Sequence, residues 1–335
     1  MMRDVQNFIT NRKVTILTIC FVTMLILKKF TTNMKVPRMN LFRKEIILQL
    51  HTSTNLINFI SLVLDKMPRC SDNLKPEKLF YENDFWQVLE TSNGKFKLFN
   101  AFYDERNFFK DQNNSAIKII AMVDRVEITI PSFCQLWFDD FQEPVISKVV
   151  DWHLMWAPMW GNNPNGSPYL ITCFNPLTFY DLIPTSVSLV ETECDKASNE
   201  MKIINNFPRN EEKKMIGICS KLFKYPGDDS MMLIEWIEIQ LSLGIEKIVF
   251  HVIEIHPNMM KVLRFYELRE RVKIEMFSLP RDVEPIEQNL LQGIQTEMIQ
   301  MNDCFYKNIN EFSFLVWTSF WALWTILKIS ICRFC

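Results

Sequence analysis

The fold of this chain is decided by residues 215–277, which contain the segments Met215-Ile-Gly-Ile-Cys219, Lys247-Ile-Val-Phe-His251 and Val272-Lys-Ile-Glu-Met-Phe277. All three are short and rich in residues that favour strands. A segment with helical spacing of apolar residues, from Ser230 to Leu243, separates the first two, and a second begins at Pro257. The order strand, helix, strand, helix, strand predicts a parallel sheet, which binds ligands beyond the carboxyl ends of its strands.

Composition places the chain among ordinary globular proteins, with 335 residues, 48% hydrophobic residues and a net charge of −2. This charge and the lack of a basic stripe argue against nucleic-acid binding. The sequence contains no G-x-G-x-x-G or G-x-x-x-x-G-K-[ST] motif and only 7 glycines, so a glycine-rich phosphate loop is not expected. The 4 histidines include no H-E-x-x-H pair, which argues against a zinc site.

Several short motifs follow one another in and around the predicted sheet. They are Cys134-Gln-Leu-Trp-Phe138, Trp160-Gly161, Pro168-Tyr-Leu-Ile171, Val187-Ser-Leu-Val190, Leu233-Ile-Glu-Trp-Ile-Glu238, His256-Pro-Asn258 with Lys261-Val-Leu263, and Asn302-Asp-Cys-Phe-Tyr-Lys-Asn308. In this order they resemble glycosyltransferase family 92, from about Ala101 to Asn308. The resemblance implies an α/β, GT-A-like (Rossmann-type) sheet flanked by helices and preceded by a β-rich region. It also implies inverting transfer of a hexose, with galactose expected, from a nucleotide sugar to a glycan, assisted by a divalent cation such as manganese.

The sequence departs from the family where the cation should bind. In the family, a strand after the Asn-Asp-Cys-Phe-Tyr motif ends in Asp-x-Asp, whose carboxylates hold the metal. Residues 312–327 contain no acidic side chain, and the chain ends at Cys335. A metal held by carboxylates stabilises the charge that develops on the leaving phosphate. We therefore predict a domain truncated before Asp-x-Asp that is inactive as written, with no metal ligands and no nameable catalytic residues.

Residues 312–335 have three possible interpretations. They are a second membrane segment, a buried strand followed by further apolar residues, or sequence from an altered reading frame. We favour the last and expect an aberrant hydrophobic tail. The alternative to a glycosyltransferase is then a non-catalytic, membrane-anchored lumenal protein that binds a ligand or a partner.

An apolar, uncharged run from Val14 to Leu27 predicts a membrane helix. At ~1.5 Å per residue it is shorter than the ~30 Å hydrocarbon core, but flanking lysines and a thin early-secretory membrane lessen the mismatch. A cleaved signal peptide is the alternative, and no A-x-A-like site follows the run. We predict a transmembrane signal-anchor at residues 14–30.

Two features of the sequence predict opposite orientations of this helix in the membrane. Three basic residues precede the run and six follow it closely, which favours a cytoplasmic C-terminal side. The family resemblance implies the opposite, a single-pass type II protein of the Golgi or endoplasmic reticulum with a lumenal domain. The cysteines and the glycosylation sequons at Asn113 and Asn165 agree with the lumenal orientation, which we favour.

These patterns predict six segments. They are a cytoplasmic tail (1–13), the signal-anchor (14–30), a stem and domain entry (31–100), a β-rich part (101–206), a nucleotide-sugar-binding half (207–311) and the aberrant tail (312–335).

Six of the 9 cysteines lie between the anchor and the tail: Cys70, Cys134, Cys173, Cys194, Cys219 and Cys304. An even set is compatible with up to three disulfides, in 15 possible connectivities. Some of the six can instead be small buried hydrophobic residues, and we expect this of Cys219, which lies in a predicted core strand.

Candidate nucleotide-sugar ligands lie at predicted strand ends or within the resembling motifs: Lys221, Glu235, His251, His256, Asn302 and Asp303. Lys221 can neutralise a phosphate, and Asp303 can accept a hydrogen bond from a ribose hydroxyl or help to hold a metal. Simpler roles compete, because strand-end lysines are often solvated and single histidines often satisfy local hydrogen bonds. Trp160 is a candidate for stacking on a sugar, against the alternative of core packing.

Overall fold

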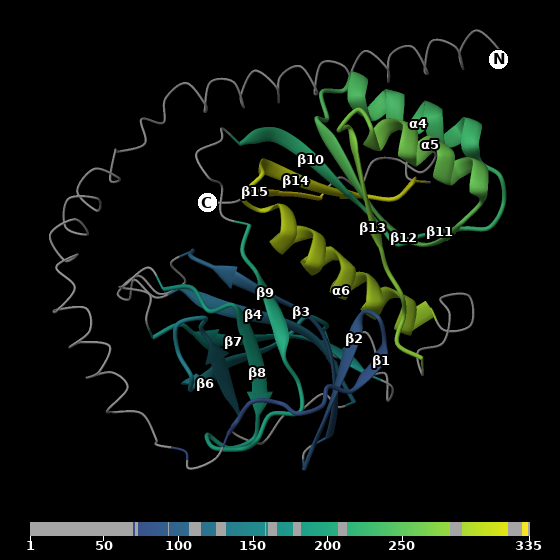
Figure 1. Ribbon diagram of the computed structural model, residues 1–335. Helices are drawn as coiled ribbons and strands as arrows, with labels where there is room; N and C mark the ends of the chain where they lie inside the picture. Colours follow the sequence, from purple (N-terminus) through teal and green to yellow (C-terminus); the bar gives the residue numbers. More distant parts are fainter. Residues whose placement is uncertain are drawn as a thin grey trace, which may run out of the picture. The chain divides into compact units, whose positions relative to one another are not determined.

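The structure is a computed structural model (Figure 1). It describes residues 70, 73–92, 94–106, 115–124, 132–157, 159, 166–176, 182–206, 213–281, 290–320 and 330–333. The predicted anchor, the sequons at Asn113 and Asn165, and Trp160 lie outside these ranges. Within them, no helix has the length and apolar character needed to cross a membrane.

A nine-stranded sheet occupies the first part of the described chain. Its strands are β1 (Tyr81–Asn83), β2 (Trp86–Thr91), β3 (Gly94–Asp104), β4 (Ala116–Val123), β5 (Phe133–Trp137), β6 (Val145–Leu154), β7 (Ser167–Phe174), β8 (Ser186–Val190) and β9 (Met201–Ile204). They are ordered β1-β2-β3-β4-β7-β6-β5-β8-β9, and β9 also pairs with β3, which closes the sheet on itself. Its first three strands lie wholly or largely within the segment predicted as a stem and domain entry, residues 31–100. The pairing of β2 with β3 ends at Thr91 opposite Gly94.

A second sheet contains the predicted strand and helix alternation. Its strands are β10 (Lys214–Ser220), β11 (Phe223–Tyr225), β12 (Lys247–Ile255), β13 (Val272–Met276), β14 (Phe312–Thr318) and β15 (Ser330–Arg333). β13, β12, β10 and β14 are neighbours in that order and run parallel, while β15 is antiparallel to β14. The chain therefore builds outward from β10 on one side and returns to its other side with β14. In open α/β sheets the crevice at such a switch point, at the carboxyl ends of the strands, is where ligands bind.

Three described helices flank this sheet: α4 (Ser230–Ser242), α5 (Pro257–Glu267) and α6 (Leu290–Asn308). Ile248 and Phe250 of β12 share a buried cluster with Leu233 of α4 and Leu263 of α5. His251, which points to the other side of the strand, contacts α6. Figure 1 shows α4 and α5 together on one side and α6 between this sheet and the closed sheet. An α/β architecture is therefore confirmed.

The strand β4 explains how α6 joins the two sheets. It is buried along its whole length, which is unusual for a sheet with one solvated face. Ile117 and Ile119 fill the interior of the closed sheet. Ile120 and Met122, on the outer face, belong to a cluster that includes Ile299 of α6. One helix therefore covers the outer face of the closed sheet and one face of the parallel sheet.

The apolar stretch after α6 differs from the prediction of an aberrant tail. Residues Phe312–Thr318 form β14 and pair with β10 in continuous parallel register, from Lys214–Phe312 to Ser220–Thr318. Phe312 and Leu315 are fully buried. Of the three interpretations, the buried strand holds for this part, because its apolar side chains are packed between α6 and the sheet. Residues 321–329 lie outside the described ranges.

Gly217 in β10 lets this central strand pair form. A Cβ atom at this position would lie 2.9 Å from Cδ1 of Phe312, closer than packed atoms approach. We expect Gly217→Ala to lower the free energy of unfolding by about 1–3 kcal/mol through overpacking. Gly227→Ala is the matched control, because nothing lies within 4 Å of its Cβ position. Urea denaturation measures both, and equal midpoints for the two variants would contradict the prediction.

Three disulfides join the six cysteines as Cys70–Cys194, Cys134–Cys173 and Cys219–Cys304. The second links β5 to β7 across the interior of the closed sheet, and the third links β10 to α6. The prediction that Cys219 is an unbonded buried residue is wrong. Cys219 is buried, but Cys304 of α6 faces it directly, with the two Cα atoms 6.1 Å apart.

Candidate functional site

A buried pair, His251 of β12 and Asp303 of α6, lies at the centre of the polar contacts between the sheet and the helix. Nε2 of His251 is 3.1 Å from Oδ2 of Asp303, and the two side chains are 1% and 0% exposed. Buried polar groups at this depth are stabilised only when they have hydrogen-bond partners. The pair must therefore be supported by its neighbours.

Gln300, one helical turn before Asp303, sets the tautomer of the histidine. Its Nε2 donates to the backbone oxygen of Ser220 at 2.9 Å, and a carbonyl oxygen can only accept, so the orientation of the amide is fixed. The same nitrogen lies 3.0 Å from Nδ1 of His251, which must accept its second proton. The ring proton is then on Nε2, from which it is donated to Asp303.

Two lysines and a second carboxylate extend the network along α6 and β13. Nζ of Lys307 lies 2.9 Å from Asp303 and 3.4 Å from Glu275, and Lys273 lies 2.6 Å from the other oxygen of Glu275. Burial raises the pKa of Asp303, but the hydrogen bond from His251 and the charge of Lys307 outweigh it and hold that pKa below its usual range. Burial lowers the pKa of Lys307, and the charges of Asp303 and Glu275 more than reverse this effect. Asp303, Lys307 and Glu275, whose pKa is also lowered, are therefore charged at neutral pH.

The closed sheet adds one residue to this network. Nδ2 of Asn100 in β3 donates to Oδ1 of Asp303 at 2.6 Å. The pairing of β3 with β4 shifts by one residue between Leu98 and Asn100, so Phe99 is the extra residue of a β-bulge. Successive side chains of a regular strand point to opposite faces, and a bulge changes this alternation. Here both Phe99 and Asn100 line the same cavity.

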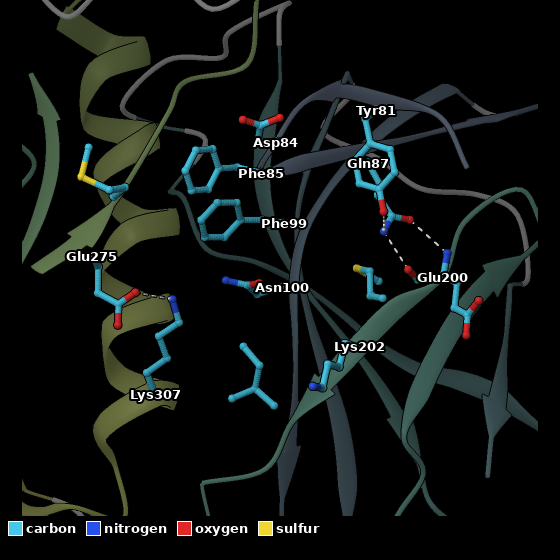
Figure 2. Close-up of a pocket in the computed structure, with 13 residues that line it drawn as sticks. Tyr81, Asp84, Phe85, Gln87, Phe99, Asn100, Glu200, Lys202, Glu275 and Lys307 are labelled. Carbon is cyan, nitrogen blue, oxygen red and sulfur yellow. Dashed lines mark hydrogen bonds and ion pairs between the residues drawn. The ribbon is translucent and has the colours of Figure 1, made fainter. Parts of the chain in front are cut away.

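This cavity has a volume of about 480 Å³ and lies between the closed sheet and the wall formed by β13 and α6 (Figure 2). Figure 2 shows the rings of Phe85 and Phe99 projecting toward the wall that carries Glu275 and Lys307. Gln87 anchors the opposite side through hydrogen bonds to the backbone of Glu200. The described lining comprises Tyr81, Asp84, Phe85, Gln87, Phe99, Asn100, Glu200, Met201, Lys202, Ile204, Glu275, Met276 and Lys307.

A second place of interest is the switch point, where β10 and β14 end side by side. Ser220 is opposite Thr318 in the register, and the backbone N–H of Lys221 donates to the oxygen of Thr318 at 3.0 Å. The Lys221 side chain is 47% exposed and pairs with Glu297 of α6 at 3.0 Å. The carboxyl ends of these strands therefore place one exposed ammonium group near Thr318 and Ser319, while Ser220 is buried.

These residues do not fit a divalent cation. Magnesium and similar hard cations need oxygen ligands that usually include carboxylates. The end of β14 supplies Thr318, followed by Ser319, and the carboxylate of Glu297 is paired with Lys221. Within the described ranges, no three or more His, Cys, Asp or Glu side chains form a group that can hold a metal.

Sequence comparison identifies the part of the chain that builds this sheet. Residues 214–319 match the family model described as Glycosyltransferase family 92. This region is thus similar to glycosyltransferase family 92. The match runs from the first residue of β10 to just beyond β14. It confirms the resemblance for the motifs from Leu233 to Asn308, while the motifs before residue 214 lie outside the match. It also continues past Asn308, which corrects the prediction that the family pattern is lost there.

The other comparisons add no argument. No curated protein matches the chain. A solved structure of ferredoxin-NADP+ reductase from Plasmodium falciparum with 2'P-AMP is similar at a TM-score of 0.16 and 10% identity. The similarity covers 70% of this chain and 100% of that chain, but a TM-score this low supports no conclusion about fold or function.

The structure brings together only some of the residues predicted for the family 92 site. His251 and Asp303 are hydrogen-bonded, and Lys221 lies at the switch point. The remaining three are placed elsewhere or have local structural roles, as follows.

Glu235 is exposed on α4, which covers the sheet face opposite α6. His256 is the N-cap of α5, where its Nδ1 accepts the N–H of Asn258 at 3.3 Å. Asn302 donates to the backbone oxygen of Met298 within α6. Prediction from motif position alone therefore mixes ligand candidates with residues that stabilise helices.

The family motif at residues 302–308 acquires a structural explanation from α6. Asp303 binds His251, Cys304 bonds to Cys219, and Lys307 pairs with Asp303 one turn later. Sequence reasoning missed Lys307, although its spacing of four residues from Asp303 on a helix is the signal for such a pair. Asn100 gives no comparable signal, because it is 203 residues away from Asp303 in the sequence.

Proposed function

We propose that this chain is a nucleotide-sugar-binding protein of glycosyltransferase family 92 and that, as written, it transfers no sugar. The family match supports a glycosyltransferase at the general level. The single observation that carries the proposal is the switch point, where β14 ends in Thr318 and Ser319 beside Lys221 and presents no carboxylate pair. Within the described residues, the sheet offers a platform for a donor, but no group of acidic side chains there suits metal-assisted transfer.

The donor is proposed to lie across the carboxyl ends of β10 and β14. Strand order β13-β12-β10-β14 supports a GT-A-like, Rossmann-type sheet, whose ligands bind at this point. Lys221 can neutralise a diphosphate by exchanging Glu297 for it, because an ion pair this exposed contributes little to stability. For relatives that retain the acidic pair, the proposed activity is inverting transfer of a hexose, with galactose expected, from a nucleotide sugar to a glycan. Manganese is the cation proposed to assist that transfer.

The three disulfides support a location in the secretory pathway. Such bonds form in oxidising compartments and are rare in reducing ones. We accordingly place the domain in the lumen of the Golgi or endoplasmic reticulum as part of a single-pass type II protein. Protection of the domain from protease in sealed microsomes tests this placement, and digestion without detergent would contradict it.

A direct assay tests both halves of the proposal. The full chain is incubated with manganese and a panel of nucleotide sugars, and both donor binding and release of nucleoside diphosphate are measured. We expect the chain to bind a nucleotide sugar even when manganese is left out. With manganese present, we expect no release of nucleoside diphosphate above background. Release above background would overturn the claim of inactivity, and the absence of binding to every donor would overturn the claim of a donor site.

The variant Lys221→Ala, measured in the same assay, tests whether the donor binds beside Lys221. We expect this variant to weaken donor binding about tenfold, because a hydrogen bond to a charged group contributes about 1.5–3 kcal/mol. Lys261→Ala is the matched control, since Lys261 is an exposed lysine of α5 on the opposite side of the sheet. Equal affinities for the two variants would place the donor elsewhere.

The second candidate is a non-catalytic, membrane-anchored lumenal protein that binds a glycan or a partner and no donor. The regular pairing of β14 favours it, because the stretch without carboxylates is an ordered central strand of the sheet. It becomes the preferred function if no nucleotide sugar binds in the assay above.

A further inference from the structure

We propose that the cavity between the closed sheet and the wall of β13 and α6 is a binding site for a neutral sugar ring of a glycan. None of the switch-point residues Ser220, Lys221 and Thr318 lines it. The proposal is therefore independent of the donor site proposed above. Its volume of about 480 Å³ lies within the range of small-ligand sites, about 300–1,000 Å³.

One side of the cavity offers aromatic surface. The rings of Phe85 and Phe99 line it, and Tyr81, also in the lining, has 54% of its surface exposed (Figure 2). Phe99 is only 8% exposed and packs on Trp86 and Phe277, so it supports the surface that Tyr81 and Phe85 present. A pyranose ring has an apolar face of C–H groups, and rigid aromatic rings bury such a face with little loss of conformational entropy. An exposed tyrosine beside two more buried rings provides a stacking surface that is open to an incoming glycan.

The facing side offers polar groups already held in position. Asn100 lines the cavity and uses one N–H on Asp303, which leaves its other N–H and its oxygen for a ligand. Lys307 has three N–H bonds and two ion-pair partners, Asp303 at 2.9 Å and Glu275 at 3.4 Å. Donors and acceptors placed side by side suit hydroxyl groups, which both donate and accept.

These polar groups are rigid before any ligand arrives. Asp303 fixes both Asn100 and Lys307, and Glu275 is fixed by Lys273 and Lys307 together. Ligands bind more tightly when the side chains of a site need not be ordered on binding. The buried network thus has a role beyond stability, because it positions the groups that face the ligand.

The charge of the lining argues for a neutral ligand. The described lining contains three carboxylates, Asp84, Glu200 and Glu275, against the two ammonium groups of Lys202 and Lys307, so one negative charge is in excess. The charge of Lys307 is compensated by Asp303 and Glu275. A phosphate or a nucleotide would meet net repulsion here, whereas a neutral hexose would not.

Sugar binding to the full chain, in the absence of nucleotide, tests the proposal. The probes are methyl glycosides of galactose, glucose, mannose and N-acetylglucosamine, together with lactose, observed by saturation-transfer NMR and titration. We expect at least one probe to bind at millimolar concentrations. Met276→Trp should weaken that binding by about tenfold or more, because Met276 lines the cavity, is 50% exposed and has room for a larger side chain that fills the site.

Met231→Trp is the matched control, since Met231 is an exposed methionine on α4, away from the cavity. We expect it to bind the sugar as the unaltered chain does. No binding by any probe, or undiminished binding by Met276→Trp, would overturn the proposal. Binding that requires added nucleotide would place the sugar at the switch point and would also overturn it. Failure of the donor assay leaves this result unaffected, so the two proposals can fail separately.

Discussion

Asp303→Ala is expected to lower the free energy of unfolding by about 3–5 kcal/mol, the cost of removing one member of a buried ion pair. The carboxylate of Asp303 is fully buried and accepts from His251, Lys307 and Asn100. Removing it leaves the buried N–H of His251 without its acceptor, and it leaves Lys307 with Glu275 as its ion-pair partner. The lost hydration of these groups is not recovered. Chemical denaturation followed by tryptophan fluorescence measures the change.

Glu297→Ala is the matched control for Asp303→Ala. It removes a carboxylate from the same helix and breaks a pair with a lysine, but that lysine is 47% exposed. The expected loss is under about 1 kcal/mol, as for ion pairs near solvent. If both variants lost the same stability, the buried network would contribute no more than a surface pair, and the argument for its positioning role would fail.

The same network predicts a response to acid. The pKa of Asp303 is lowered in the folded chain, so its stabilising contribution is present above the pKa of the unfolded chain, about 3.9 for an aspartate. That contribution is lost as the pH falls through the lower folded pKa. Glu275 and Glu311 also have lowered pKa values and act in the same direction. Asp303→Asn should therefore reduce, without abolishing, the loss of stability below about pH 4.

Local sequence pattern was sufficient to predict the parallel sheet but not its last strand. The predicted segments from 215 to 277 match β10, α4, β12, α5 and β13 closely, because each has a strong periodicity and clear ends. A buried strand is one of three interpretations of the β14 segment, and the sequence does not single it out because a strand buried on both faces has no alternation to reveal it. Only the packing of Phe312 against Gly217 and the pairing with β10 define it, and both depend on residues about 95 positions away.

The cavity is beyond sequence reasoning for a related reason. Its walls come from β1, β2, β3 and β9 on one side and from β13 and α6 on the other. The bulge that directs both Phe99 and Asn100 into it depends on how β3 pairs with β4. Prediction from motifs favours residues at the carboxyl ends of parallel strands, where general rules place ligands. Motifs give no information about a cavity between two sheets.

Removing the Cys219–Cys304 bond is expected to destabilise the chain by about 4 kcal/mol, since the bond closes a loop of 85 residues. The double variant Cys219→Ala with Cys304→Ala avoids a free thiol and buries no new polar group. The bond holds α6 on β10 beside the contact of Gln300 with Ser220, so its loss should also speed amide hydrogen exchange throughout α6. Denaturation and hydrogen exchange measure the two effects.

The double variant Cys70→Ala with Cys194→Ala separates the general loss of stability from the local increase of hydrogen exchange in α6. Its loop is 124 residues, so chain entropy predicts a loss of stability within about half a kcal/mol of the first variant. Hydrogen exchange of α6 should remain slow in this variant, because neither cysteine touches that helix. Loss of Cys219–Cys304 should therefore weaken sugar binding at the cavity, while loss of Cys70–Cys194 should not. If both variants bound sugar equally, the fixed position of α6 on β10 would be irrelevant to the site.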